Sequence, residues 1–234
     1  MKQHKFTSIG TLTIALSLLL TACGGDTPAP ASAAGAENTP AVSDEKSTSD
    51  GLSPEMEAIV KTVNAETAES AGVCGADLVW YYKDSVLVIS GEGEMTHYEL
   101  SDRPWEDIDD EIGLIYISEG VTSIGKGAFR RCSNLSRVVL PNTIIEEIGS
   151  SAFSECEQLA ELTVPASVKR VGHHGLSGES ILFQGDAPEP IKLDFDNMDI
   201  IATYPATVTY CGEGFEPFIE YYREDAPELT WVKG

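Results

Sequence analysis

The sequence predicts a β-rich solenoid, a short stack of similar coils with a parallel strand ladder and a cap at each end. Two observations lead to this prediction. Residues 123–135 have the sequence SIGKGAFRRCSNL and residues 147–159 have EIGSSAFSECEQL, so Ile, Gly, Ala, Phe, Cys and Leu recur with a period of 24 residues. Short alternating apolar pairs separate these motifs at nearly the same period. Self-similarity at such a period is typical of solenoids and other repeat architectures.

Each copy of the motif supplies apolar side chains to a shared core. Gly125, Gly149 and Gly172 mark three copies, and the third is shorter and degenerate, as in the last coil of a stack. One unit cannot bury its apolar residues alone, whereas stacked units can. Glycine suits this position if a side chain would clash there or if φ is positive. We predict that the core contains Ile124, Phe129, Cys132, Leu135, Ile148, Phe153, Cys156, Leu159 and Val171, with Phe129 directly over Phe153.

The alternating pairs predict one short strand per coil, at residues 115–117, 138–140, 162–164 and 181–183. Because alternate side chains of a strand point to opposite faces, the residue between each apolar pair points outward. Exposed Val and Leu in register on one face are typical of a contact patch for a partner, although scattered exposed apolar residues are also ordinary. The predicted partner-binding face consists of Tyr116, Arg137, Val139, Glu161, Thr163 and Leu182.

The segments on either side of the repeats are expected to act as caps, which the open ends of a solenoid require. Residues 78–82 and 86–90 are β-rich and flank a turn at 83–85, which predicts a hairpin. Before it, Ser53 and Pro54 predict the N-cap and first position of a helix. Residues Met56, Ile59, Val60 and Val63 have helical spacing, and we expect this helix to dock on the hairpin. After the repeats, we expect a short helix at 216–222 and a last strand at 230–231.

The amino terminus predicts export. A basic start is followed by twelve apolar residues, 9–20, which is too short for the ~20 residues that span a bilayer. Residues 1–22 are therefore predicted to be a signal peptide. Residues 24–53 are rich in Ala, Pro, Ser and Thr and have few large aliphatics, so residues 23–53 are predicted to form a disordered tether.

The sequence LTAC, ending at Cys23, resembles the lipobox of bacterial lipoproteins. This resemblance implies that Cys23 becomes a diacylglyceryl cysteine and anchors the protein to the membrane on the extracytoplasmic side. Two acyl chains are enough for stable anchoring. The alternative is an ordinary signal peptide followed by a chance cysteine.

The charge of the chain excludes one class of partner. The formal net charge is −23, and removal of residues 1–22 would leave 13 basic against 38 acidic residues, a net charge of −25. Nucleic-acid binding is excluded because it requires clustered Lys and Arg. Such acidity keeps a protein soluble by mutual repulsion, and an affinity for cations or basic ligands is the alternative.

The motif and its flanks resemble the BspA-like leucine-rich repeat family, whose units have Ile-Gly-x-x-Ala-Phe-x-x-Cys-x-x-Leu followed by Ile-x-Ile-Pro. The resemblance extends over residues 74–231, although this chain has two full repeats and relatives often have many. We divide the folded part into an N-terminal cap (54–112), leucine-rich repeats (113–190) and a C-terminal cap (191–234). The resemblance implies a cell-surface protein of a bacterium, with a Gram-positive source favoured, and adhesion or host-matrix contact for some relatives.

The sequence provides no constellation for catalysis, a metal or a cofactor, so we expect none of the three. Cys132 and Cys156 are expected to be apolar fillers, although adjacent coils would also permit a disulfide between them. Cys74 and Cys211 lie in opposite caps, and we expect both to be unpaired. His173 and His174 point in different directions and are expected to form a solvated turn. The acidic run at 106–111 does not fit an EF-hand loop and is expected to be a solvated cap loop.

We therefore predict a non-enzymatic, lipid-anchored surface protein whose repeat domain binds a protein or glycan partner, with adhesion as its role. The alternative is an envelope scaffold that binds another surface protein or itself.

Overall fold

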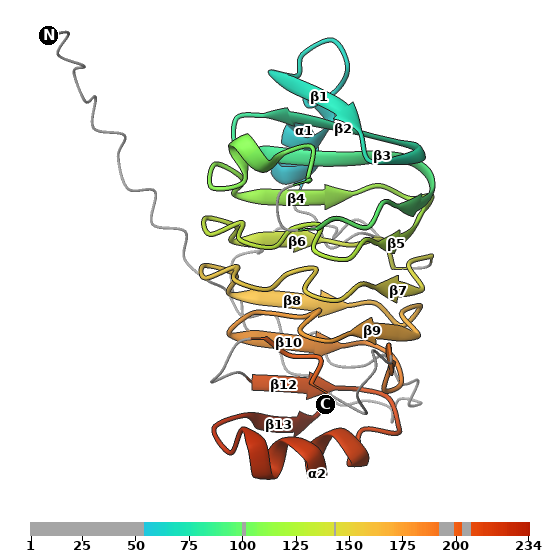
Figure 1. Ribbon diagram of the computed structural model, residues 1–234, viewed down its shortest axis with the longest axis vertical. Helices are drawn as coiled ribbons and strands as arrows, with labels where there is room; N and C mark the ends of the chain where they lie inside the picture. Colours follow the sequence, from blue (N-terminus) through green and yellow to red (C-terminus); the bar gives the residue numbers. More distant parts are fainter. Residues whose placement is uncertain (1–53, 100–101, 143, 192–198, 203–206) are drawn as a thin grey trace, which may run out of the picture. The chain divides into compact units, whose positions relative to one another are not determined.

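The solenoid predicted from the repeat is present in the computed structural model, and it has two parallel ladders (Figure 1). The structure describes residues 54–99, 102–142, 144–191, 199–202 and 207–234, all of which belong to one unit, residues 34–234. The predicted signal peptide, Cys23, the tether and the N-cap Ser53 lie outside the described residues. The two ladders contain the strands of about five successive coils.

The first ladder, which we call ladder A, contains the predicted strands and extends past them at both ends. Its pairs are parallel and bring equivalent residues together, such as Ile115 opposite Val138 and Leu162 opposite Ile181. The inward residues of these pairs are almost completely buried. In spatial order ladder A consists of β3 (Val86–Met95), β4 (Leu114–Ile117), β6 (Arg137–Val139), β8 (Glu161–Val164), β10 (Ser180–Phe183), β12 (Thr207–Tyr210) and β13 (Thr230–Lys233).

The second ladder, ladder B, was not predicted. It starts from the far half of β3 and continues through β5 (Val121–Ile124), β7 (Glu147–Ile148), β9 (Arg170–Gly172) and β11 (Glu189–Ile191). All of its pairs are parallel. The sequence pattern that could have revealed it is the recurrence of an aliphatic residue directly before each motif glycine, at Ile124, Ile148 and Val171, all three fully buried.

A stack of aromatic rings forms the centre of the core. The ring centroids of Phe129 and Phe153 are 5.5 Å apart with an interplanar angle of 24°, and both side chains are fully buried. The prediction that these rings lie over one another is confirmed. Trp105 extends the stack at 5.4 Å from Phe129, and its indole N–H donates to the carbonyl of Ala128 at 2.8 Å. Trp105 therefore takes the place that phenylalanine has in the repeats, next to the 3₁₀ turn Glu106–Ile108.

The motif glycines are required by the close approach of one coil to the next. A Cβ atom on Gly149 would lie 2.5 Å from the backbone nitrogen of Lys126, and one on Gly172 would lie 2.2 Å from that of Ser150. Both distances are shorter than any real contact of a Cβ atom. Of the two reasons considered for glycine here, the clash applies, and no positive φ is found at these residues.

The N-terminal cap is a three-stranded antiparallel unit with a helix. β2 (Gly75–Lys83) and β3 form the predicted hairpin, and β1 (Ser70–Val73) adds a strand that was not predicted. The turn residues Asp84 and Ser85 have φ of 49° and 66°, as a two-residue type I′ hairpin turn requires. The helix α1 (Pro54–Lys61) docks on this hairpin as expected, because Val60 packs in a cluster with Val86 and Val88 of β3.

The C-terminal cap closes the other end of the core. The helix α2 (Glu216–Asp225) is longer than predicted, and β13 also extends past the predicted strand. Phe218 and Tyr222 of α2 are buried in the same cluster as the repeat core. Ladder A therefore continues to both sides of residues 113–190, since β3 precedes them and β12 and β13 follow.

Candidate functional site

The outward face of ladder A is the first candidate site. Its strands bring a row of uncharged side chains into register: Thr163 lies opposite Leu182, Leu182 opposite Thr209, and Thr209 opposite Val232. Thr163, Leu182 and Thr209 are half-buried, and Val232 is 42% exposed. This row, which we call the A row, presents an uncharged strip across four strands of the face.

Two of the residues predicted for this face, Val139 and Tyr116, are less accessible than the prediction assumed. Val139 is only 6% exposed, so the prediction that it is an exposed contact residue was wrong. Its short side chain lies beside Tyr116, which is opposite it in the register. Tyr116 is half-buried against the cluster that joins Val60 of α1, and Val63 just after the helix, to Leu114. The helix therefore covers the face at β3, as the predicted docking on the hairpin implies, and also at β4, which was not predicted.

The other predicted residues are accessible. Arg137 and Glu161 are exposed and in register on β6 and β8, next to the A row. Thr163 and Leu182 belong to the A row itself. Four of the six predicted residues thus lie within or next to the A row. The A row also contains Thr209 and Val232, which were not predicted.

The outward face of ladder B has a different character, because its charges pair from coil to coil. Lys169 contacts Glu146 at 2.8 Å and Arg170 contacts Glu147 at 2.6 Å. All four residues are on or beside β7 and β9, and three of them are more than half exposed. Ladder B therefore presents a solvated, self-paired surface, whereas ladder A presents the uncharged A row.

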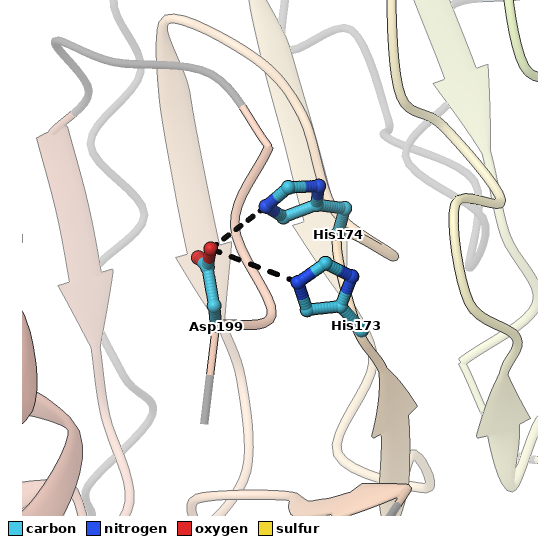
Figure 2. A group of neighbouring side chains, drawn as sticks. All are labelled: His173, His174 and Asp199. Atoms are coloured by element: carbon cyan, nitrogen blue, oxygen red, sulfur yellow. Dashed lines mark hydrogen bonds and ion pairs between the residues drawn. The ribbon is translucent and has the colours of Figure 1, made fainter. Parts of the chain in front are cut away.

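The second candidate site is a pair of histidines that meets a carboxylate (Figure 2). His173 and His174 follow β9, and their rings stack with centroids 3.9 Å apart. Nε2 of His174 lies 2.7 Å from Oδ2 of Asp199, and Nε2 of His173 lies 3.9 Å from the same oxygen. The expected turn is present, but the expectation that the two histidines point in different directions was wrong, since their rings stack and face a shared carboxylate.

Backbone contacts explain how Asp199 reaches this turn. The N–H of His174 donates to the carbonyl of Asp199 at 2.8 Å, and Leu176 and Ile201 form a parallel bridge. Residues 199–202 thus stack on the third repeat as a further coil would. His174 has φ of 53°, in the left-handed region, as do Gly127 and Ser151 at the equivalent places of the earlier coils. The turn that orients the histidine ring is therefore a feature of the repeat.

The carboxylate is itself held in place from α2. The hydroxyl of Tyr222 donates to Oδ1 of Asp199 at 3.1 Å and accepts the backbone N–H of Ile201 at 2.9 Å. The pKa of His173 is lowered, first by burial and then by the charge of His174, while Asp199 acts in the opposite direction. Two imidazoles and a carboxylate are thus gathered at one point, and within the described residues no other group of three metal-ligating side chains was found.

A basic cavity of about 50 Å³ lies near the N-terminal cap, lined mainly by Tyr98, Arg103, Lys126, Arg130 and Arg131. Its cations already have carboxylate partners: Lys126 contacts Glu99, and Arg130 and Arg131 both contact Glu155. Charge pairing within the protein therefore accounts for the basic lining.

The acidic run at 106–111 forms an ion pair within the N-terminal cap. Arg103 is buried and contacts Asp109 at 2.7 Å. Burial raises the pKa of Asp109, and the Arg103 charge opposes that effect. The run is therefore tied to the cap through Asp109, rather than fully solvated as expected.

The thiols of the repeats are inert fillers, as predicted. Cys132 and Cys156 are free and buried, and burial raises the pKa of Cys132 to about 12 and that of Cys156 well above its ordinary value. Cys74 is also free and buried. For Cys211 the expectation stays a prediction, because Cys23, the one cysteine left to pair with it, lies outside the described residues. A reactive cysteine must be accessible and ionised, and none of the three free thiols meets that condition.

Comparisons with known proteins found one similar solved structure and one family of repeats. A solved leucine-rich repeat protein from Eubacterium ventriosum is similar at 20% identity and a TM-score of 0.43; the match covers 60% of this chain and 44% of that chain. The present chain thus spans less than half the length of that protein. A comparison with curated proteins produced no match. Among the described residues, no helix has the length and apolar character needed to cross a membrane.

The family comparison agrees with the motif and with the double ladder. Residues 109–189 match the model of the BspA type leucine rich repeat region, in six copies. These residues include the fully buried Phe129 and Phe153 and the glycines at which the coils touch. The repeats of this chain belong to the BspA-type leucine-rich repeat family.

Proposed function

We propose that this protein is a lipid-anchored surface protein that binds a protein partner through the outward face of ladder A. Leucine-rich repeat solenoids are typically non-catalytic binding scaffolds, and proteins with BspA-type repeats are typically bacterial surface proteins. The observation that supports this face is the A row, an uncharged strip in register across four strands. The A row is suited to close contact, because its side chains are uncharged and no ion pair within the row has to be desolvated.

A binding experiment with a matched control tests the face. Leu182→Glu places a charge at the centre of the A row, whereas Thr122→Glu places the same charge at a half-buried position of ladder B. The full-length protein is tested against host-matrix proteins, glycans such as those of host surfaces, and envelope extract. We expect L182E to abolish capture of the partner and T122E to retain it. Equal capture by both variants would contradict the assignment of the face.

The identity of the captured partner decides between adhesion and a scaffold role. Capture of host-matrix proteins or host glycans would support a role in adhesion. Capture of envelope proteins alone would favour the scaffold. Turnover in a screen for hydrolase activity, lost on a defined substitution, would contradict the proposal that the protein is not an enzyme.

Self-association is a second candidate, and one observation favours it. β13 is the last strand of ladder A in the described residues, so one of its edges has no strand beside it there. A free edge can pair with a strand of another chain. Sedimentation of the full-length protein in detergent over a range of concentrations tests this candidate. A mass that stays at that of one chain would exclude it.

The anchor is tested separately. We expect Cys23→Ser to release the protein from the membrane fraction and to abolish incorporation of labelled fatty acid, because the lipobox-like sequence places the acyl chains on this residue. Cys74→Ser serves as the control, since this thiol is buried in the cap. Membrane association that persists in C23S would contradict the lipid anchor while leaving the binding face untouched.

A further inference from the structure

We propose that His173, His174 and Asp199 form a binding site for a divalent transition-metal ion, of which Zn²⁺ fits best. The two histidines were expected to point in different directions, which makes a poor chelate without a third ligand. The structure supplies that ligand from a segment 25 residues away. The three ligand atoms all lie within 4.8 Å of one another (Figure 2).

The distances suit an ion of this size. Zn–N and Zn–O bonds are about 2.0–2.2 Å long, so ligand atoms around a tetrahedral ion lie roughly 3.3 Å apart. The two separations from Asp199 Oδ2, 2.7 Å to His174 and 3.9 Å to His173, lie on either side of that value. Binding also requires one imidazole to rotate out of the stack, because a metal ion lies in the plane of each imidazole that binds it. The ion would replace the present hydrogen bond between His174 and Asp199.

The ligand chemistry selects the class of metal. Imidazole nitrogens suit Zn²⁺, Cu²⁺ and Ni²⁺, whereas Ca²⁺ and Mg²⁺ are bound by oxygen ligands. Two imidazoles with a carboxylate form a ligand set that is common at zinc. The site therefore discriminates against the abundant hard cations.

Hydrogen bonds from neighbouring residues hold the proposed ligands in position. Metal-bound carboxylates are usually oriented by hydrogen bonds from the residues behind them. The buried Tyr222 hydroxyl provides this bond to Asp199 Oδ1, which leaves Oδ2 directed at the histidines. The backbone bond from His174 to Asp199 fixes the separation of the two segments.

The second histidine distinguishes a metal site from a simple ion pair. A structural bond between residues 199–202 and the repeat needs only His174, which is 2.7 Å from the carboxylate. His173 faces the same oxygen at 3.9 Å, too far for a hydrogen bond, and stacks on His174. An ion between the three groups gives this second ring a role. The side chains remain partly exposed, so a fourth position is open to water or to a ligand from a partner.

Zinc titration of the full-length protein, purified in detergent without a polyhistidine tag, tests the proposal. Calorimetry is expected to show one Zn²⁺ per chain, with no comparable response to Mg²⁺ or Ca²⁺. Affinity should fall at least tenfold in His173→Gln, His174→Gln and Asp199→Asn. The control His97→Gln, which removes an exposed histidine elsewhere, should leave affinity unchanged. Tyr222→Phe is expected to weaken binding about 10–100-fold through the loss of orientation.

His173→Gln is the decisive variant, because its ring makes no hydrogen bond within the described residues. We expect this variant to melt at the wild-type temperature without metal and to lose the increase in melting temperature that Zn²⁺ produces in the wild type. If Zn²⁺ fails to bind the wild type, or binds H173Q and H174Q as tightly as it binds the wild type, the proposal is wrong and His174 serves only as an ion-pair partner of Asp199.

Discussion

Single residues in this protein act mainly by touching their equivalents one coil away. Phe153 stacks on Phe129, and Cys156 donates a hydrogen bond to the carbonyl of Phe129 at 3.2 Å. The same relation holds for charges, as Arg130 and Arg131 of one coil both contact Glu155 of the next. A substitution in one coil is therefore expected to affect two.

The stability of the ring stack can be measured directly. Phe153→Ala leaves a cavity in a fully buried site, and such changes cost about 3–5 kcal/mol of unfolding free energy. We expect a loss of this size in urea titration. Val232→Ala, at a residue that is 42% exposed, should change the free energy by no more than about 0.5 kcal/mol. Similar losses in the two variants would show that the stack is not the centre of the core.

A pH dependence follows from Glu155. Hydrogen bonds from Arg130, and then Arg131, lower its pKa below the ordinary 4.5. A carboxylate with a lowered pKa stabilises the folded state above its unfolded-state pKa, and that contribution is lost as pH falls through the folded-state pKa. We expect Glu155→Gln to melt below the wild type at pH 7, and the difference to narrow as pH falls below about 4.5.

The neighbouring Glu157 provides the control for this experiment. Glu157 is exposed and has no ion pair within the described residues. Glu157→Gln should therefore show little difference from the wild type at either pH. A difference in melting temperature between E155Q and the wild type that stays constant with pH would contradict the assigned role of the Glu155 carboxylate.

The elements of this fold have separate tasks. Ladder A and ladder B enclose the core, α2 closes one end, and the β1–β3 unit closes the other. α1 differs from these, because it packs on the outward face of ladder A through a small second cluster. It therefore sets how much of that face is left for a partner.

Docking of α1 depends on Val60, which is 8% exposed, whereas its neighbour Ile59 is 42% exposed. We expect Val60→Asp to detach the helix, since a buried charge without a partner is strongly unfavourable. Hydrogen exchange of the α1 amides, followed by mass spectrometry, should then become fast. Ile59→Asp should leave the exchange slow, and equally fast exchange in both variants would place α1 off the sheet.

The whole molecule is a stack in which each coil contacts only its neighbours. Stability in such proteins is close to a sum of the contributions of coils and of the interfaces between them. Central coils have two interfaces, and the outermost strands have one. The acidic charge of −23 adds mutual repulsion that no single contact compensates.

Exchange rates along the stack are expected to reflect this arrangement. Amides of β5, β6, β7 and β8 should exchange most slowly in the native protein, and those of β1 and β13 most rapidly, because end strands open by local unfolding. Peptide-level hydrogen exchange measures the order. Uniform protection from β1 to β13 would indicate that the stack opens only as one cooperative unit.

Much of this architecture could be predicted, because it repeats. Ile124 and Ile148, Phe129 and Phe153, and Leu135 and Leu159 are each 24 residues apart, so their equivalence is visible in the sequence itself. The same period places like residues over one another whatever the details of the coil. The core residues and the strands of ladder A follow from it, and ladder B could have been found by the same reasoning.

The contacts that define the candidate sites do not repeat from coil to coil, so the period of the sequence does not predict them. Val60 lies in one cluster with Leu114, and the side chain of Asp199 meets that of His174, and neither contact has an equivalent in a neighbouring coil. A periodic pattern determines which residues share a face because each coil faces a near copy of itself. The tertiary structure alone decides what covers the ends of that stack, since the caps are unique segments whose contacts are set by three-dimensional packing.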